Sequence, residues 1–201
     1  MRPFTFIILF LATFLLIHCK EAPSHNLKEE KAIVIDSVEV SKKALALNQI
    51  EGKWYYKNQP YNGYSLKFYP NDTLAERLGF LNGKREGVAR IWSEKGVLRV
   101  ESTYHQNRLT GIYKSWWENG VLAEESHYVN GLKQGEEKQW HATGQLSKVR
   151  QLVKGNEEGF QKAWLPNGKI YVNYEAKNGR IFGMLRANSC YKLENELVIR
   201  D

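Results

Sequence analysis

A 24-residue repeat constrains this chain more than any other feature of its sequence. Five complete units begin with a glycine and carry an aromatic residue five positions later, a turn residue nine positions later and an aliphatic residue eleven positions later, and a sixth unit begins with a glycine but lacks the aromatic residue. The leading glycines are Gly63, Gly87, Gly111, Gly135, Gly159 and Gly183. The aromatic positions are Phe68, Trp92, Trp116, Trp140 and Trp164. A fixed period of this length is typical of repeat architectures.

The residues inside each unit predict a β-hairpin. Two runs of about six residues, rich in Val, Ile, Tyr and Trp, flank a turn whose Gly or Asn tolerates positive φ. A second turn pair, such as Asn130-Gly131, joins one hairpin to the next. One hairpin alone is marginal in water, so each must stack on its neighbours. We therefore predict an all-β fold, a single-layer meander of hairpins that forms an open sheet or solenoid.

Composition agrees with one repeat array and short ends. The array fills residues 49–188 of the 201-residue chain. Hydrophobic residues make up 42%, which is ordinary for a solenoid with much surface, and the 12% of aromatic residues gather at repeat positions. The net charge of +7 favours anionic partners. Because 22 acidic residues are interspersed, a solvated surface explains this charge equally well.

The first nineteen residues predict a bacterial lipoprotein signal. Arg2 precedes the apolar run Phe4–Ile17, which is too short for a membrane span of about 20 residues. The signal segment ends at Cys19, which would be lipidated and become the mature N-terminus. Leu16 matches the usual aliphatic residue, whereas His18 stands where a small residue is usual. The alternatives are an uncleaved anchor and a secretory signal cut elsewhere.

The segments on either side of the array are interpreted separately. Residues 20–48 are a charged tether followed by a candidate edge strand, Ala32–Val40. Ser41–Gln49 fits a helical turn and a linker equally. Residues 189–201 break the repeat register and are interpreted as a C-terminal cap or tail. Within them Cys190 is interpreted as a small buried hydrophobe.

Catalytic and cofactor motifs are not apparent in the sequence. The histidines His105, His127 and His141 fall at different repeat phases, and no cysteine pair or acidic cluster has ligand spacing. The sequence contains no nucleophile elbow, P-loop or dinucleotide fingerprint. We therefore expect neither an enzyme nor a bound metal or cofactor.

A basic residue follows most of the leading glycines by three positions. The set is Arg90, Lys114, Lys138, Lys162 and Arg186, and alternation along a strand places it on the face of Trp92, Trp116, Trp140 and Trp164. In one interpretation each cation covers the neighbouring rings and gains cation–π energy. In the other, these residues form a binding strip for anionic lipid, an acidic glycan or a carboxylate-rich protein segment. Nucleic acid is not expected as a partner of an exported protein.

The repeat core, Gly87–Trp92 followed by Gly96–Leu98, resembles the MORN repeat variant. Through Gly52–Gly63 and Asn173–Gly183, the body from about residue 50 to 195 is similar to the bacterial YwqK-family antitoxins. This resemblance implies a MORN-like open sheet, and the group's label implies that a toxin is neutralised by binding. An export signal separates this chain from a cytoplasmic antitoxin.

Together these features predict a non-enzymatic lipoprotein of the bacterial cell envelope, at the outer membrane or periplasmic face. It would be anchored in the membrane through Cys19 and would act as a repeat scaffold for a protein partner. One alternative is a toxin-neutralising, antitoxin-like binder. Another is a binder of anionic lipid or glycan through the basic and aromatic strip.

Overall fold

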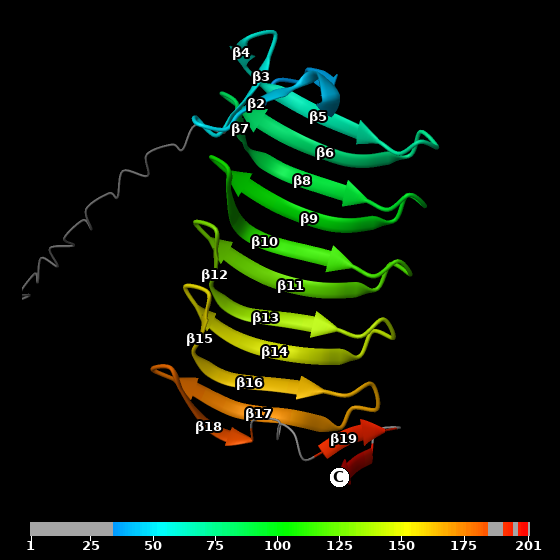
Figure 1. Cartoon of the computed structure of the whole chain (residues 1–201), viewed down its shortest axis with the longest axis vertical. Helices are drawn as coiled ribbons and strands as arrows, with labels where there is room; N and C mark the ends of the chain where they lie inside the picture. The colour runs from blue at the N-terminus through cyan, green and yellow to red at the C-terminus, as the bar shows by residue number, and fades with distance from the viewer. Residues whose placement is uncertain (1–33, 185–190, 195–196, 201) are drawn as a thin grey trace, which may run out of the picture. The chain divides into compact units, whose positions relative to one another are not determined.

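The computed structural model describes residues 34–184, 191–194 and 197–200. Over these residues the chain consists of strands joined by turns, apart from one short 3-10 helix, η1 (Lys42–Ala44). The strands of the repeat region follow one another in chain order across one open sheet (Figure 1). Neighbouring strands from β5 to β18 are antiparallel. The predicted all-β meander is confirmed.

Long strands cross the sheet, and short strands form the hairpin tips on one side. The long strands are β5 (Gly63–Phe68), β6 (Leu74–Leu81), β8 (Gly87–Trp92), β9 (Leu98–His105), β10 (Arg108–Trp116), β11 (Leu122–Val129), β13 (Gly135–Trp140), β14 (Leu146–Val153), β16 (Gly159–Trp164), β17 (Ile170–Lys177) and β18 (Arg180–Met184). The tip strands are β7 (Lys84–Arg85), β12 (Leu132–Lys133) and β15 (Asn156–Glu157).

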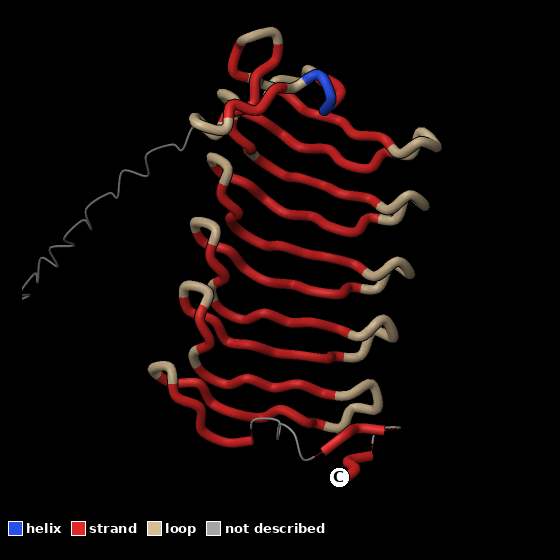
Figure 2. Tube along the Cα trace, in the orientation of Figure 1, coloured by secondary structure: helices blue, strands red, loops and turns tan. Residues whose placement is uncertain are grey.

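Two kinds of turn line the two sides of the sheet (Figure 2). At the tips both central residues have positive φ, as at Asn130 (51°) and Gly131 (85°). This is the type I′ geometry, whose twist matches that of the flanking strands. On the other side each loop has one residue of positive φ, such as Gly120 at 80°. The alternation of turn residues in the sequence therefore encodes the alternation of turn types.

Backbone hydrogen bonds connect four of the tip turns to the segment one repeat earlier. The Gly131 amide donates to the Leu109 carbonyl at 2.8 Å, and the Gly155 amide donates to the Lys133 carbonyl at 2.8 Å. The same bond recurs from Gly83 to Tyr61. These bonds satisfy turn amides that would otherwise need water. They also couple each hairpin to its neighbour beyond the strand ladder itself.

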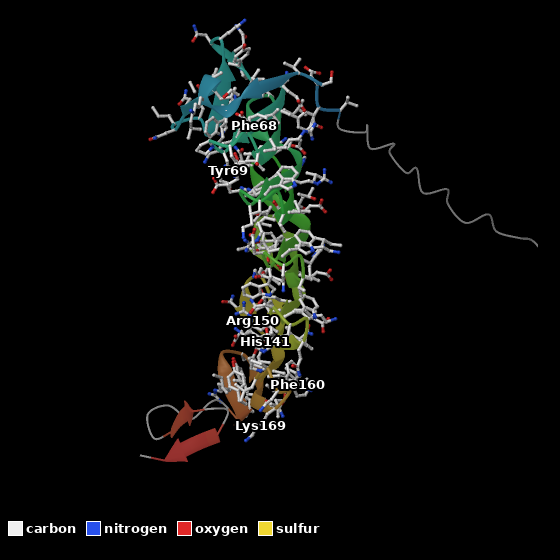
Figure 3. The ribbon with its side chains drawn as sticks, turned by 90° about the vertical axis from the view of Figure 1, so that its right-hand side faces the viewer. Phe68, Tyr69, His141, Arg150, Phe160 and Lys169 are labelled. Atoms are coloured by element: carbon white, nitrogen blue, oxygen red, sulfur yellow. The ribbon has the colours of Figure 1, made fainter. Side chains whose placement is uncertain are left out.

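The pairing register divides the side chains between two faces (Figure 3). The inner face carries the cross-strand pairs Ser65–Leu78, Ala89–Ser102, Tyr113–Ser126, Glu137–Arg150 and Gln161–Tyr174, most of which are buried. The outer face carries the pairs Leu66–Arg77, Arg90–Glu101, Lys114–Glu125, Lys138–Val149 and Lys162–Asn173. Each long hairpin shifts register just before its aromatic position, as between Ser115 and Trp116.

A small three-stranded sheet covers the first repeats on the inner face. This cap sheet consists of β2 (Ala46–Asn48), β3 (Lys53–Tyr56) and β4 (Gln59–Pro60). Leu45 and Tyr61, which flank it, form one hydrophobic cluster with Leu78, Phe80 and Ala89, and Trp54 and Tyr56 pack against that cluster. The ring centroids of Trp54 and Phe80 lie 6.0 Å apart in an edge-to-face arrangement.

The cap sheet changes the expected start of the array. We predicted an array over residues 49–188 in a single layer, but β2, β3 and β4 form a separate sheet and the continuous hairpins begin at β5. The aromatic residues of β3 explain the difference. By packing against the cluster around Phe80 they bury apolar surface that would stay exposed if β3 were an edge strand of the main sheet. Edge position falls instead to β1 (Glu39–Ser41), which pairs in parallel with β5.

At the other end, β19 (Tyr191–Glu194) and β20 (Leu197–Arg200) form a two-stranded antiparallel sheet of their own. The segment Ser41–Gln49, which fitted a helical turn or a linker, contains η1 and then β2. Several predictions concern positions outside the described residues. These are the signal and lipidation site at Cys19, the tether over residues 20–31, and the roles of Arg186 and Cys190.

Candidate functional site

Four of the predicted strip cations lie in one row on the outer face. Arg90, Lys114, Lys138 and Lys162 occupy equivalent positions on β8, β10, β13 and β16, and each of these strands is two strands from the next. The usual strand spacing places successive members about 9.5 Å apart. The fifth predicted member, Arg186, lies outside the described residues.

Carboxylates compensate three members of this row. Arg90 Nε lies 2.7 Å from Glu101 Oε2, Lys114 Nζ lies 3.1 Å from Glu125 Oε2, and Lys138 Nζ lies 2.6 Å from Glu136 Oε1. The hydrogen bond to Glu136 raises the pKa of Lys138. The row is therefore a line of surface ion pairs rather than a strip of uncompensated positive charge.

The fourth member, Lys162, makes a different contact. Its ammonium group lies 6.0 Å from the centroid of the Phe160 ring. This matches the interpretation in which a cation covers an aromatic neighbour. Among the described residues, no such contact joins the row to the tryptophans at the repeat positions.

The four repeat tryptophans are half-buried, and their carbonyl groups have a structural role. Each carbonyl accepts a hydrogen bond from a side chain of the preceding repeat. The donors are Tyr69 Oη to Trp92 at 2.9 Å, Arg99 Nε to Trp116 at 2.7 Å, Trp117 Nε1 to Trp140 at 2.9 Å and His141 Nε2 to Trp164 at 2.9 Å. In three cases the donor directly follows the aromatic position of its own repeat. These bonds connect repeats on the side opposite the hairpin tips.

Exposed apolar side chains form a second row on the outer face. Val88, Ile112 and Phe160 are 40%, 56% and 61% exposed and stand directly after their leading glycines. Glu136 occupies the equivalent position between Ile112 and Phe160. On each of these strands the apolar residue lies two positions before the basic residue and so shares its face. An apolar row flanked by ion pairs is thus the main chemical feature of this face.

A buried ionic cluster on the inner face was not predicted. Glu137 is only 1% exposed, and its carboxylate accepts from Arg150 Nε at 2.8 Å and from Lys133. Lys133 also donates to Glu124 at 2.7 Å. Arg150 in turn lies 3.9 Å from the carboxylate of Glu157. The cluster therefore alternates in sign, and each buried charge has at least one opposite partner.

Burial and hydrogen bonding shift the pKa values of two groups on the inner face, Lys133 and Tyr174. Burial alone would lower the pKa of Lys133, but hydrogen bonds from its ammonium group to Glu124 and Glu137 outweigh this and raise the pKa. Burial and a 2.6 Å hydrogen bond to Glu157 raise the pKa of Tyr174 to about 12. Lys133 is therefore charged and Tyr174 neutral over the physiological range.

The described residues contain no group of three His, Cys, Asp or Glu side chains placed to hold a metal ion. They also contain no helix that is long and apolar enough to cross a membrane.

Comparison with known families identifies the repeat. A family model described as MORN repeat variant matches residues 85–106 and 109–130. These segments are successive units that cover β7 to β9 and β10 to β11. No curated protein matches the chain. The expected MORN-variant resemblance is therefore confirmed for two adjacent repeats.

The inner ionic cluster generates a prediction about stability. Glu137→Ala leaves Arg150 and Lys133 without their shared partner, so we expect the free energy of unfolding to fall by roughly 3 kcal/mol, at the lower end for a broken buried pair. The control is Glu136, the neighbouring residue, which lies on the opposite face of the sheet. Glu136→Ala removes only its exposed ion pair with Lys138, so we expect the free energy of unfolding to fall by less than about 1 kcal/mol. Denaturant unfolding of both variants measures the difference, and equal losses would contradict a buried role for Glu137.

Proposed function

We propose that this protein is a non-enzymatic repeat scaffold whose outer face binds a protein partner. The observation that carries this proposal is the row of exposed apolar side chains, Val88, Ile112 and Phe160, on a face bordered by ion pairs. Protein interfaces have this composition, with an apolar centre and a polar rim. Exposed apolar surface with a polar rim is also typical of sites of protein interaction.

The ion pairs favour a protein over a simple anionic ligand. A strip that binds lipid headgroups or an acidic glycan needs cations without internal partners, but Arg90, Lys114 and Lys138 already face carboxylates. A protein surface of mixed charge can instead match the alternating signs of the outer face. The anionic-surface alternative is supported by Lys162, whose head rests on Phe160 and has no carboxylate partner among the described residues.

Two features of the sequence support a class of partner. The similarity of Gly52–Gly63 and Asn173–Gly183 to YwqK-family antitoxins supports a toxin that is blocked by occupation of its surface. The signal-like N-terminus supports a partner in the cell envelope. In this proposal Cys19 carries the lipid, the tether spans residues 20–31, and the repeat body works at a membrane surface. Several acyl chains make such anchoring stable, because each buried CH₂ contributes about 0.8 kcal/mol.

Site-specific photo-crosslinking in intact cells tests the outer face. We expect a crosslinker at Ile112 to capture one protein partner, because this side chain is 56% exposed in the middle of the apolar row. The matched control is a crosslinker at Ile181, which is 48% exposed but pairs with Ala176 and so belongs to the inner face. Mass spectrometry identifies what each position captures.

Two outcomes would contradict the outer-face proposal. The same protein captured equally at both positions would show no preference between faces. Capture of lipid or glycan alone at Ile112 would instead favour the anionic-surface alternative. The Ile112→Asp variant provides an independent check, since it should weaken partner capture in a pull-down while leaving the folded state unchanged.

The membrane anchor has its own test. Cys19→Ala removes the only predicted acylation site, so we expect the variant to shift from the membrane fraction to the soluble fraction of disrupted cells. Labelling with a radioactive fatty acid should mark the wild type but not the variant. Equal membrane retention of both proteins would sink the lipoprotein proposal while leaving the crosslinking result interpretable.

A further inference from the structure

A small hollow lies on the inner face where β14, β16 and β17 adjoin. Its volume is about 210 Å³, and its polar lining includes Lys148, Arg150, Glu157, Gln161 and Tyr174. Lys162 and Tyr171, from the same two strand pairs, also border it. Ala163 and Val172 supply the apolar part of its wall. Pockets for drug-sized ligands usually measure about 300–1,000 Å³. An occupant of this hollow would therefore be a small fragment, such as one terminal residue of a chain.

Gln161 provides an acceptor that the protein leaves unused. The residue is 2% exposed, and its Nε2 donates to the carbonyls of Gln151 at 2.9 Å and Gly159 at 3.2 Å. These two carbonyls fix which end of the amide is the nitrogen. The remaining oxygen, Oε1, is buried and has no hydrogen-bond partner. Leaving a buried acceptor without a hydrogen bond costs free energy. A ligand N–H that donates to this oxygen would therefore contribute more binding free energy than the same hydrogen bond on an open surface.

Lys148 provides a cation in the same hollow. It pairs across the sheet with Gln139 and Ala163, which places it on the inner face. It makes no ion pair with any described carboxylate, whereas Arg150 is engaged by Glu137 and Glu157. The equivalent residues of the other described repeats are Glu76, Val100, Glu124 and Val172. Only this repeat therefore combines a cation here with the amide of Gln161.

Tyr174 and Glu157 hold one wall of the hollow in place. The phenol donates to the Glu157 carboxylate at 2.6 Å, and Arg150 approaches the same carboxylate from the other strand pair. Glu157 and Arg150 therefore neutralise each other's charge. On the inner face, Lys148 has no ion-pair partner among the described residues and Gln161 Oε1 has no hydrogen-bond partner. Lys162 borders the same hollow, but its pairing with Asn173 places its strand position on the outer face.

We propose that this hollow binds a carboxylate whose neighbouring carbon carries an N–H group, the chemistry shared by a peptide C-terminus and a free amino acid. The carboxylate pairs with the ammonium group of Lys148, and the N–H donates to Gln161 Oε1. The ligand side chain lies against Ala163 and Val172. This site is on the face opposite the proposed partner surface, so its test does not depend on the outcome of the crosslinking.

An NMR titration of the purified full-length protein tests this site. The probes are N-acetyl-leucine, its carboxamide, and free leucine. We expect N-acetyl-leucine to shift the amide resonances of residues 159–163 and 171–174. The carboxamide, which lacks the charge, should bind about tenfold more weakly, as expected for loss of one charge-assisted hydrogen bond. Tighter binding of N-acetyl-leucine than of leucine would identify a peptide terminus as the ligand, and the reverse order would identify an amino acid.

Matched lysine variants locate the charge. Lys148→Gln should weaken N-acetyl-leucine binding about tenfold. The control, Lys154→Gln, makes the same charge change at an exposed tip turn and should leave binding unchanged. Glutamine suits this position, because Gln106 occupies the equivalent turn two repeats earlier. Equal effects of the two variants, equal affinity for acid and carboxamide, or the absence of shifts in residues 159–163 would each overturn the proposal.

A third variant tests the acceptor. Gln161→Ala places at this position the residue that Ala89 already provides in an earlier repeat. It should reduce the affinity for N-acetyl-leucine but not for the ester analogue in which oxygen replaces the N–H. Loss of both affinities with an unchanged melting temperature would remove Gln161 from the site. If this variant unfolds, the lysine pair still decides the question.

Discussion

Hydrogen bonds between neighbouring hairpins hold the described part of this protein together. On one side of the sheet, turn amides such as that of Gly131 donate to the carbonyls of the preceding repeat. On the other side, the tryptophan carbonyls accept from side chains of the preceding repeat, as Trp140 does from Trp117. Both sets recur with the sequence period, and each needs only the adjacent hairpin. Stability therefore accumulates from nearest neighbours, as expected for a repeat protein.

This arrangement explains why the inner face changes character along the array. The cap sheet covers the first repeats, where Leu78, Phe80 and Ala89 form an apolar cluster. In later repeats the equivalent central pair is Glu137 with Arg150, and buried charges satisfy one another. Because backbone coupling holds the sheet throughout, these later positions are free to become polar. The hollow beside Lys148 belongs to this polar part. The outer face instead carries exposed apolar residues in three repeats, with Glu136 between them, and ion pairs at Arg90, Lys114 and Lys138.

The period predicted the hairpins, both kinds of turn and the row of basic residues, because these depend on local backbone geometry and strand alternation. It did not predict the partners of the basic row. Arg90 and Lys114 each face a glutamate eleven residues later, at Glu101 and Glu125, and that spacing acquires meaning only from the pairing register. That β2, β3 and β4 form a separate sheet was also not predicted, since the packing of Trp54 on Phe80 is a contact between distant segments. The buried Glu137 gave no local signal because an alternating strand does not reveal which face is covered.

Deletion of one whole repeat tests nearest-neighbour coupling most directly. Removing residues 135–158 joins Gln134 directly to Gly159, so that Gln134 takes the place of Glu158. The two side chains have the same role: Glu158 accepts a hydrogen bond from the Asn178 amide, and Gln134 accepts one from the Lys154 amide. We predict that the shortened protein keeps a β-sheet circular dichroism spectrum and unfolds cooperatively in denaturant, with a smaller dependence on denaturant concentration because less surface is exposed. An unfolded or aggregated product would contradict this account, because it would mean that the array is stabilised as one indivisible core.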